Sequence, residues 1–164
     1  MGFSYKPVRF DDLTAINIVD PIPGIAASYD EIAHSLAKNL PEGLILLDGF
    51  PTANFSALLE YLCRVKPGII TIDVSRFHRS SGEIQELLKP YLHQDRDLDP
   101  ELIFGKLFDR DFHPFFDLEK VGSFLNSLVD GQMVVLYGLG SAWELFRPYS
   151  KAILYIDVTP KDAA

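Results

Sequence analysis

The chain has 164 residues, enough for one domain with a hydrophobic core and too few for two domains of ordinary size. Hydrophobic residues make up 48% of it and charged residues 23%, a balance that excludes an intrinsically disordered chain. The net charge of -8 opposes binding to a phosphate backbone, so we expect no nucleic-acid partner.

The single cysteine, Cys63, cannot form a disulfide within the chain and has no second thiol with which to build a zinc site. It therefore favours a reducing, cytoplasmic location. No apolar run approaches the roughly 20 residues that a membrane span needs, and the N-terminus lacks the apolar core of a signal peptide. None of the four histidines is paired with another at the spacing of metal ligands, so we expect no metal site.

In chain order, residues 1–28 are rich in Pro and Asp and are interpreted as an N-terminal arm, followed by one globular domain over residues 29–164. The domain opens with SYDEIAHSLAKNL, which predicts a helix capped by Ser28, with Glu31 completing a capping box. Four short apolar runs follow, at residues 43–49, 68–74, 132–138 and 151–157. Because each run is continuous rather than alternating, the runs predict strands buried on both faces, as in a parallel sheet.

Three helical patterns lie between these runs, at residues 55–66, 82–94 and 117–129. Asn54 or Ser56 can cap the first helix, and Asp117 can cap the third. Pro90 should kink or end the second. The alternation of strands and helices predicts a three-layer α/β/α fold with a mostly parallel sheet. Residues 95–116 lack a sustained period and are interpreted as a long loop or a lid-like insertion.

The stretch GFPTANFS, residues 49–56, follows the first predicted strand and precedes a helix, as a phosphate-binding P-loop does. That loop is written GxxxxGK[ST]; its glycines let backbone N–H groups approach the phosphates, and its lysine supplies a positive charge. The turn matches the pattern at Gly49 and Ser56, whereas Asn54 stands at the second glycine. Phe55 stands at the lysine, and Pro51 removes one backbone donor. We therefore predict a structural, phosphate-loop-like turn that does not bind a nucleotide in the usual way; a working nucleotide site is the alternative.

After the second predicted strand the chain reads IDVSRFHRSSGE. In the uridine kinase and phosphoribulokinase group of P-loop kinases, this strand is followed by an Asp, a Phe and a Tyr or His with Arg nearby. The resemblance is partial, because the spacing after the acid is longer here; it would make Asp73 the residue that activates an acceptor hydroxyl. Arg76, His78 and Arg79 form a cationic cluster at a strand's C-terminal end, where open α/β sheets bind ligands. The cluster is either an anion-binding site or a solvated loop.

A further turn, YGLGSAW at residues 137–143, follows the third predicted strand. Its two glycines have the spacing of a phosphate turn, but no dinucleotide-binding fingerprint follows them. We favour a tight strand exit that packs Trp143.

Five segments occur in a characteristic order: YDEIAHSL, LILLDGFPTANFSALLEYL, DPELIFGKLFDRDFHPFFDLEKV, MVVLYGLGSAW and AILYIDVTPKD. In this order they resemble the N-terminal domain that precedes the cupin domain in some bacterial class I mannose-6-phosphate isomerase-like proteins. The resemblance implies a P-loop-kinase-like fold with a degraded nucleotide site. Such a core has about five parallel strands with the first strand in its centre. The resemblance also implies a zinc-binding cupin domain after Ala164 that carries the isomerase chemistry, so no cofactor is expected in this domain and no catalytic residue is carried over.

Three functional interpretations follow. The leading one is a non-catalytic or regulatory domain of an isomerase-like protein of carbohydrate metabolism, which senses a sugar phosphate or assembles the parent enzyme. The second is an active small-molecule kinase that uses Asp73 as base and Arg76, Arg79 or Arg147 in place of the missing lysine. The third is a structural domain that forms a homodimer through the aromatic-rich residues 103–116.

Overall fold

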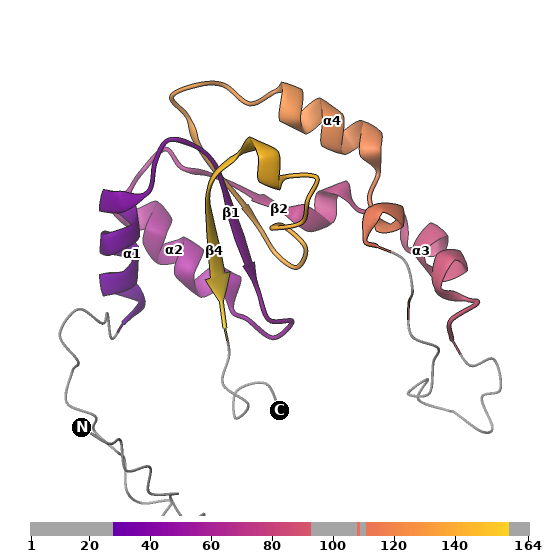
Figure 1. Cartoon of the computed structure of the whole chain (residues 1–164). Helices are drawn as coiled ribbons and strands as arrows, with labels where there is room; N and C mark the ends of the chain where they lie inside the picture. The colour runs from indigo at the N-terminus through magenta and orange to yellow at the C-terminus, as the bar shows by residue number, and fades with distance from the viewer. Residues whose placement is uncertain (1–27, 93–107, 109–110, 158–164) are drawn as a thin grey trace, which may run out of the picture.

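The computed structural model describes residues 28–92, 108 and 111–157. In these residues, four parallel strands form a sheet in the order β2–β3–β1–β4 (Figure 1). The strands are β1 (Gly43–Gly49), β2 (Ile70–Asp73), β3 (Met133–Tyr137) and β4 (Ser150–Ile156). The predicted α/β class and parallel pairing are confirmed, and β1 lies between two other strands as expected. The sheet has four strands in the described part of the chain, where about five were expected.

Helices cover both faces of this sheet (Figure 1). The α-helices are α1 (Tyr29–Asn39), α2 (Phe55–Val65), α3 (Ser81–Leu88) and α4 (Leu118–Asn126). Three short 3-10 helices are η1 (Val74–Phe77), η2 (His113–Phe115) and η3 (Arg147–Tyr149). α1 and α2 contribute to the hydrophobic cluster on one face, whereas α4 contributes to the cluster on the other. No described helix combines the length and apolar character needed to span a bilayer.

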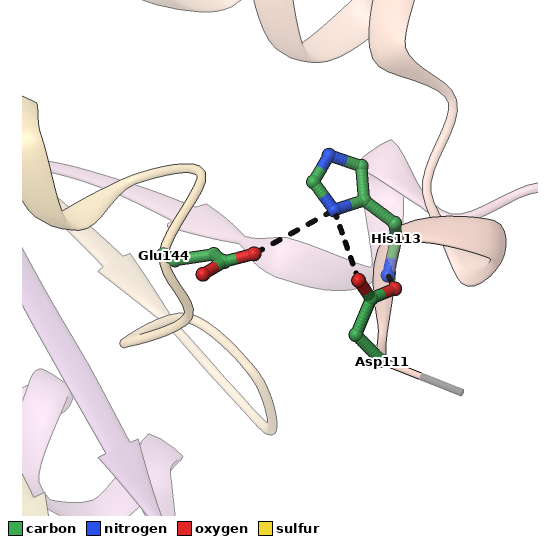
Figure 2. Close-up of side chains that lie close together, drawn as sticks. All are labelled: Asp111, His113 and Glu144. Carbon is green, nitrogen blue, oxygen red and sulfur yellow. Dashed lines mark hydrogen bonds and ion pairs between the residues drawn. The ribbon is translucent and has the colours of Figure 1, made fainter. Parts of the chain in front are cut away.

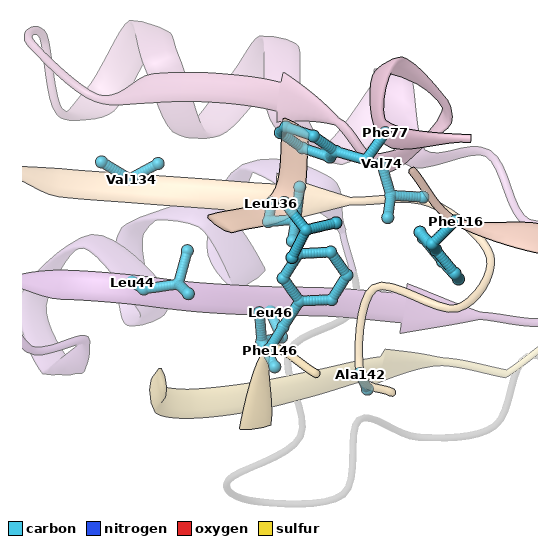
Figure 3. Close-up of a cluster of buried hydrophobic side chains, with 10 residues drawn as sticks. Leu44, Leu46, Val74, Phe77, Phe116, Val134, Leu136, Ala142 and Phe146 are labelled. Atoms are coloured by element: carbon cyan, nitrogen blue, oxygen red, sulfur yellow. The ribbon is translucent and has the colours of Figure 1, made fainter. Parts of the chain in front are cut away.

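Alternate side chains of β1 divide the core between the two faces. Ile45 and Leu47 are buried in the cluster shared with α1 and α2. Leu44 and Leu46 are buried in the opposite cluster, which contains Phe116 and Phe146 among other side chains from the segments after β2 and β3 (Figure 3). The segments that follow the carboxyl ends of β2 and β3 pack on this second cluster.

The predicted helix caps are present. Each cap accepts a hydrogen bond from the backbone three residues further on: Ser28 from Glu31 at 3.2 Å, Asn54 from Ala57 at 3.1 Å and Asp117 from Lys120 at 3.2 Å. Ser28, the last residue of the predicted N-terminal arm, is the N-cap of α1; the rest of the arm lies outside the described residues.

Two helices are shorter than their sequence patterns suggested. α3 ends at Leu88 rather than continuing to residue 94, because Pro90 has no N–H with which to extend the hydrogen-bond ladder. It begins with a capping box between Ser80 and Glu83. α4 ends at Asn126, where its pattern ran to residue 129. Most of the predicted 95–116 loop lies outside the described residues.

The expectation that all four strands are buried on both faces was wrong for the two edge strands. β4 alternates along its length: Ala152, Leu154 and Ile156 pack against the core, while Ile153 is 48% exposed and Tyr155 62% exposed. β2 likewise begins with exposed residues. An edge strand has a neighbour on one side only, so a continuous apolar run does not by itself distinguish it from an interior strand.

Candidate functional site

Four backbone N–H groups of the phosphate-loop-like turn donate hydrogen bonds within the chain. Gly49 N donates to Asp48 Oδ1 at 2.8 Å, Phe50 N to Ile156 O at 3.0 Å, Ala53 N to Phe50 O at 2.8 Å and Phe55 N to Ala53 O at 3.1 Å. A phosphate cradle instead needs N–H groups that point together at the ligand. These four N–H groups already have acceptors within the chain, so they do not point together at a ligand as the donors of a P-loop do.

The side chains of the same turn also have structural partners. Asn54 caps α2 and accepts a further hydrogen bond from Ser56 Oγ at 3.2 Å. The Phe55 ring packs against the α1–α2 side of the core, with its centroid 6.3 Å from that of Tyr137. The positions that would hold the second glycine, the lysine and the hydroxyl of a P-loop thus serve as a helix cap and a core contact.

Gly49 is required by the close approach of β1 to β4. A Cβ at this position would lie 2.7 Å from the carbonyl oxygen of Ile156 and 3.2 Å from the Ala53 Cβ. The match to the first P-loop glycine therefore has a packing explanation: glycine leaves room for the neighbouring backbone, to which Phe50 N is bonded.

Asp48, which the sequence analysis did not select, organises the end of the sheet. Its Oδ1 accepts hydrogen bonds from Gly49 N and, at 3.3 Å, from Gly140 N, and its Oδ2 accepts one from Ala142 N at 2.9 Å. The carboxylate thereby ties the end of β1 to the YGLGSAW turn after β3. The only signal in the sequence was an acidic residue at the end of a buried apolar run.

A cavity of about 570 Å³ lies beside this carboxylate. Residues at or after the carboxyl ends of all four strands line it: Asp48 in β1, His78 after β2, Gly140 after β3 and Tyr155 in β4. Its wall is largely aromatic and includes Phe112, Phe115, Phe116 and Trp143. Its volume and mostly apolar lining with a few polar groups are those of a small-molecule site.

The position of the cavity agrees with the general rule for ligand sites in open α/β sheets. After β1 the chain continues into α2 on one face, whereas after β3 it packs Ala142 and Phe146 into the cluster on the other face. The neighbouring strands β1 and β3 therefore form a topological switch point, and ligands bind outside the carboxyl ends of strands at such points.

A family model described as a domain of unknown function, DUF8485, matches residues 28–163. The chain belongs to the DUF8485 family. No curated protein and no solved structure matches the chain.

Two basic side chains of this DUF8485 domain line the cavity. His78 packs edge-on against Phe116, with ring centroids 5.0 Å apart. Burial lowers the pKa of His78 below its usual value, and the nearby Asp73 carboxylate partly opposes that shift. His78 is therefore neutral at pH 7. Arg147 donates from Nε to the Ala142 carbonyl, which holds its guanidinium at the cavity wall.

The residues of the predicted cationic cluster line different surfaces of the DUF8485 domain. Arg79 lies in a different hollow, next to Asp117, and pairs with Glu83 at 3.5 Å. Arg76 is exposed on η1. Of the three residues, His78 lines the aromatic cavity, whereas Arg76 and Arg79 do not. Asp73 caps η1 by accepting from Ser75 N at 2.8 Å.

The YGLGSAW turn of the domain is the tight strand exit that the sequence predicted. Trp143 stacks on Phe116 with centroids 5.2 Å apart and an interplanar angle of 16°. Its ring belongs both to the edge of the core cluster and to the cavity wall. A bound molecule in the cavity would therefore lie against this side chain.

Proposed function

We propose that this chain is a non-catalytic, ligand-sensing domain on a P-loop-kinase-like scaffold. One observation carries the proposal: four N–H groups of the 49–55 turn donate within the chain, and Phe55, which packs against the core, stands where a P-loop has its lysine. A triphosphate needs both the N–H groups and a positive charge. The domain keeps the strand, turn and helix of a kinase without the groups that hold the nucleotide.

The sheet supports the scaffold part of the proposal. A P-loop-kinase-like core predicts parallel strands with the first strand in the interior, and β1 lies between β3 and β4. The turn that leaves β1 leads directly into α2, as the phosphate loop of such a core leads into its helix. Other doubly wound α/β folds share both features. Among these folds, the sequence match at Gly49 and Ser56 favours a P-loop-kinase-like scaffold.

In this proposal the ligand of the cavity is a sugar phosphate. Aromatic faces such as that of Trp143 pack against the C–H face of a sugar ring, and the guanidinium of Arg147 is suited to a phosphate group. His78 adds a second donor when a phosphate draws a proton to it. The resemblance to mannose-6-phosphate isomerase-like proteins makes mannose 6-phosphate the first compound to test.

In this proposal the domain is the N-terminal part of a cytoplasmic isomerase-like protein of carbohydrate metabolism. The reaction and its zinc ion belong to a cupin domain that follows in the parent chain. Binding of a sugar phosphate to the aromatic cavity would then report its concentration to that catalytic domain.

The active-kinase alternative has less support from the geometry. Its proposed base, Asp73, accepts a hydrogen bond from the η1 backbone and does not line the cavity. Of the three arginines offered in place of lysine, Arg147 lines the cavity, whereas Arg79 pairs with Glu83.

The dimerisation alternative is favoured by a different observation. Phe112, Leu139 and Tyr155 line the cavity and are 59%, 46% and 62% exposed, so apolar surface surrounds its mouth. A partner chain that covers this surface would bury it, since contiguous apolar patches on a monomer often mark interaction sites.

Calorimetry on the full chain with Mg-ATP, ADP and mannose 6-phosphate tests the proposal. We expect binding of mannose 6-phosphate alone, accompanied by a change in the fluorescence of Trp143, the single tryptophan of the chain. Arg147→Gln should weaken this binding about 10- to 100-fold, because a hydrogen bond to a charged group contributes about 1.5–3 kcal/mol.

The matched control is Arg64→Gln, which removes an exposed arginine that pairs with Glu60 on α2 outside the cavity. This variant should bind like the unmodified chain. Magnesium-dependent binding of ATP would reject the proposal in favour of an active kinase. If no compound binds and light scattering finds a dimer, the assembly alternative replaces it.

A further inference from the structure

We propose that Asp111, His113 and Glu144 form a binding site for a divalent transition-metal ion such as Zn²⁺. Figure 2 shows the two carboxylates facing the same ring nitrogen from opposite segments of the chain. His113 Nδ1 lies 3.7 Å from Asp111 Oδ2 and 3.7 Å from Glu144 Oε1. One ligand atom from each residue lies within 4.8 Å of the others. No metal site was expected from the sequence, because none of the histidines has a second histidine at metal-ligand spacing.

The distances are close to those of a coordinated ion. Two ligand atoms that each lie about 2.1 Å from a metal ion are roughly 3.0–3.5 Å apart as neighbours in tetrahedral or octahedral geometry. The two separations from His113 Nδ1 exceed this range by about 0.2 Å, and the two carboxylate oxygens lie within 4.8 Å of each other. All three side chains are substantially exposed, between 41% and 64%, so small rotations can close the gap.

Contacts outside the ligand atoms already orient the site. The His113 N–H donates to Asp111 Oδ1 at 3.0 Å, which leaves Oδ2 to face the ring. The imidazole packs edge-on against Trp143, with centroids 4.7 Å apart and planes at 82°. Glu144 follows Trp143 directly in the sequence. The two segments that supply the ligands are thus held together by aromatic contacts to Trp143, including that of His113.

The donor set selects the class of metal. One imidazole nitrogen and two carboxylate oxygens suit Zn²⁺ and its transition-metal neighbours, whereas Ca²⁺ and Mg²⁺ prefer oxygen ligands throughout. Three protein ligands leave at least one coordination position open to water or to another molecule.

A bound ion would also stiffen one wall of the aromatic cavity. It would connect the start of η2 to the turn after β3, and their residues Phe112 and Trp143 both line the cavity. This inference goes beyond the proposed sensing function and does not depend on which molecule the cavity binds.

The single tryptophan supplies a local probe for the test. Zn²⁺ is titrated into the metal-free full chain by calorimetry, and Co²⁺, whose open d shell quenches indole emission at short range, is titrated while Trp143 fluorescence is followed. We expect one Zn²⁺ per chain and quenching by Co²⁺ that Zn²⁺ reverses by competition.

Two ligand variants and one control decide the assignment. His113→Ala and Glu144→Gln should each weaken Zn²⁺ binding by at least about tenfold, since even residues behind a metal ligand contribute about 10- to 100-fold. His34→Ala removes a histidine that also lies beside a carboxylate, 3.4 Å from Asp30 Oδ2, and should leave the affinity unchanged.

Circular dichroism checks that each variant is folded, and Glu144→Gln, which keeps the shape of the side chain, decides if His113→Ala fails to fold. Equal Zn²⁺ affinity in all variants would overturn the proposal. So would a failure of the unmodified chain to bind Zn²⁺.

Discussion

At Gly49 the backbone of β1 passes so close to β4 that a side chain does not fit. A Cβ there would lie 2.7 Å from the Ile156 carbonyl oxygen, which also accepts from Phe50 N. We expect Gly49→Ala to reduce the free energy of unfolding by about 1–3 kcal/mol, as overpacking of a core does, because the obstacle is backbone rather than a flexible side chain. Urea denaturation of the full chain measures the change.

The control for this substitution is Gly122→Ala in α4. No heavy atom outside the local helix lies within 4 Å of the Cβ that would be added there. Alanine should therefore stabilise the helix by about 0.5–1 kcal/mol through its lower conformational entropy. If both variants changed stability equally, the packing explanation of Gly49 would be wrong.

At the scale of single residues, the sequence showed which phosphate-binding groups are missing, but not which contacts the residues in their place make. Phe55 has no positive charge at the lysine position, and Pro51 has no N–H in the turn, so the sequence alone predicts that these two phosphate contacts are missing. The contact of the Phe55 ring with Tyr137 was not readable, since it joins the start of α2 to the end of β3 across the sheet. Asp48 was missed for the same reason: its partners Gly140 and Ala142 are brought to it only by strand pairing.

Among the elements, the turn after β3 depends most on one side chain. The Asp48 carboxylate accepts from the backbone of Gly49, Gly140 and Ala142. Asp48→Asn leaves one acceptor oxygen and turns an NH₂ group toward an N–H donor. We expect the free energy of unfolding to fall by about 1–3 kcal/mol, the usual cost of an unsatisfied buried donor.

Amide hydrogen exchange locates that loss in the turn, where the protection of residues 140 and 142 should fall before that of β1. The control is Asp130→Asn, which changes an exposed acid in the connection that precedes β3. It should alter stability by no more than about 0.5 kcal/mol. A similarly small effect of Asp48→Asn would mean that the turn is held by its other contacts.

Element types were predictable because each depends on local chemistry. The apolar runs gave the strands, and Ser28, Asn54 and Asp117 cap helices through backbone groups three residues away. The ends of elements were less predictable where the helical spacing of apolar residues continues past the end of the helix, as it does beyond Leu88 in α3. Strand order and the exposure of the edge strands could not be predicted, because an apolar run such as that of β4 does not show how many neighbouring strands it pairs with.

For the molecule as a whole, the cavity and the proposed metal site arise from the same arrangement. The segments after β2 and β3 meet over one face of the sheet, which places residues 111–116 against residues 139–147. His113 and Glu144 are far apart in the sequence, and no short motif joins them. The sequence predicted ligand binding at the carboxyl ends of the strands in general terms, whereas the particular groups that converge there follow from tertiary packing.

The stability of the whole molecule should respond to pH through His78. Its pKa is lowered in the folded protein, so between its folded pKa and the ordinary histidine value of about 6.5 the unfolded chain binds more protons than the folded one. The contribution of His78 to the free energy of unfolding is therefore complete above about pH 7. It declines as the pH falls through about 6.5 and becomes constant below the folded pKa.

A second effect acts in the opposite direction over the same range. The chain carries a net charge of -8 with histidines neutral, so acidification reduces the repulsion within the compact state and favours folding. The two effects separate when the unmodified chain and His78→Gln are compared at each pH by urea denaturation. Both lose the same self-repulsion, but only the unmodified chain protonates His78 on unfolding. Its stability relative to the variant should thus fall from pH 7.5 to pH 5, and a constant difference would show that His78 is as easily protonated in the folded protein as in the unfolded chain.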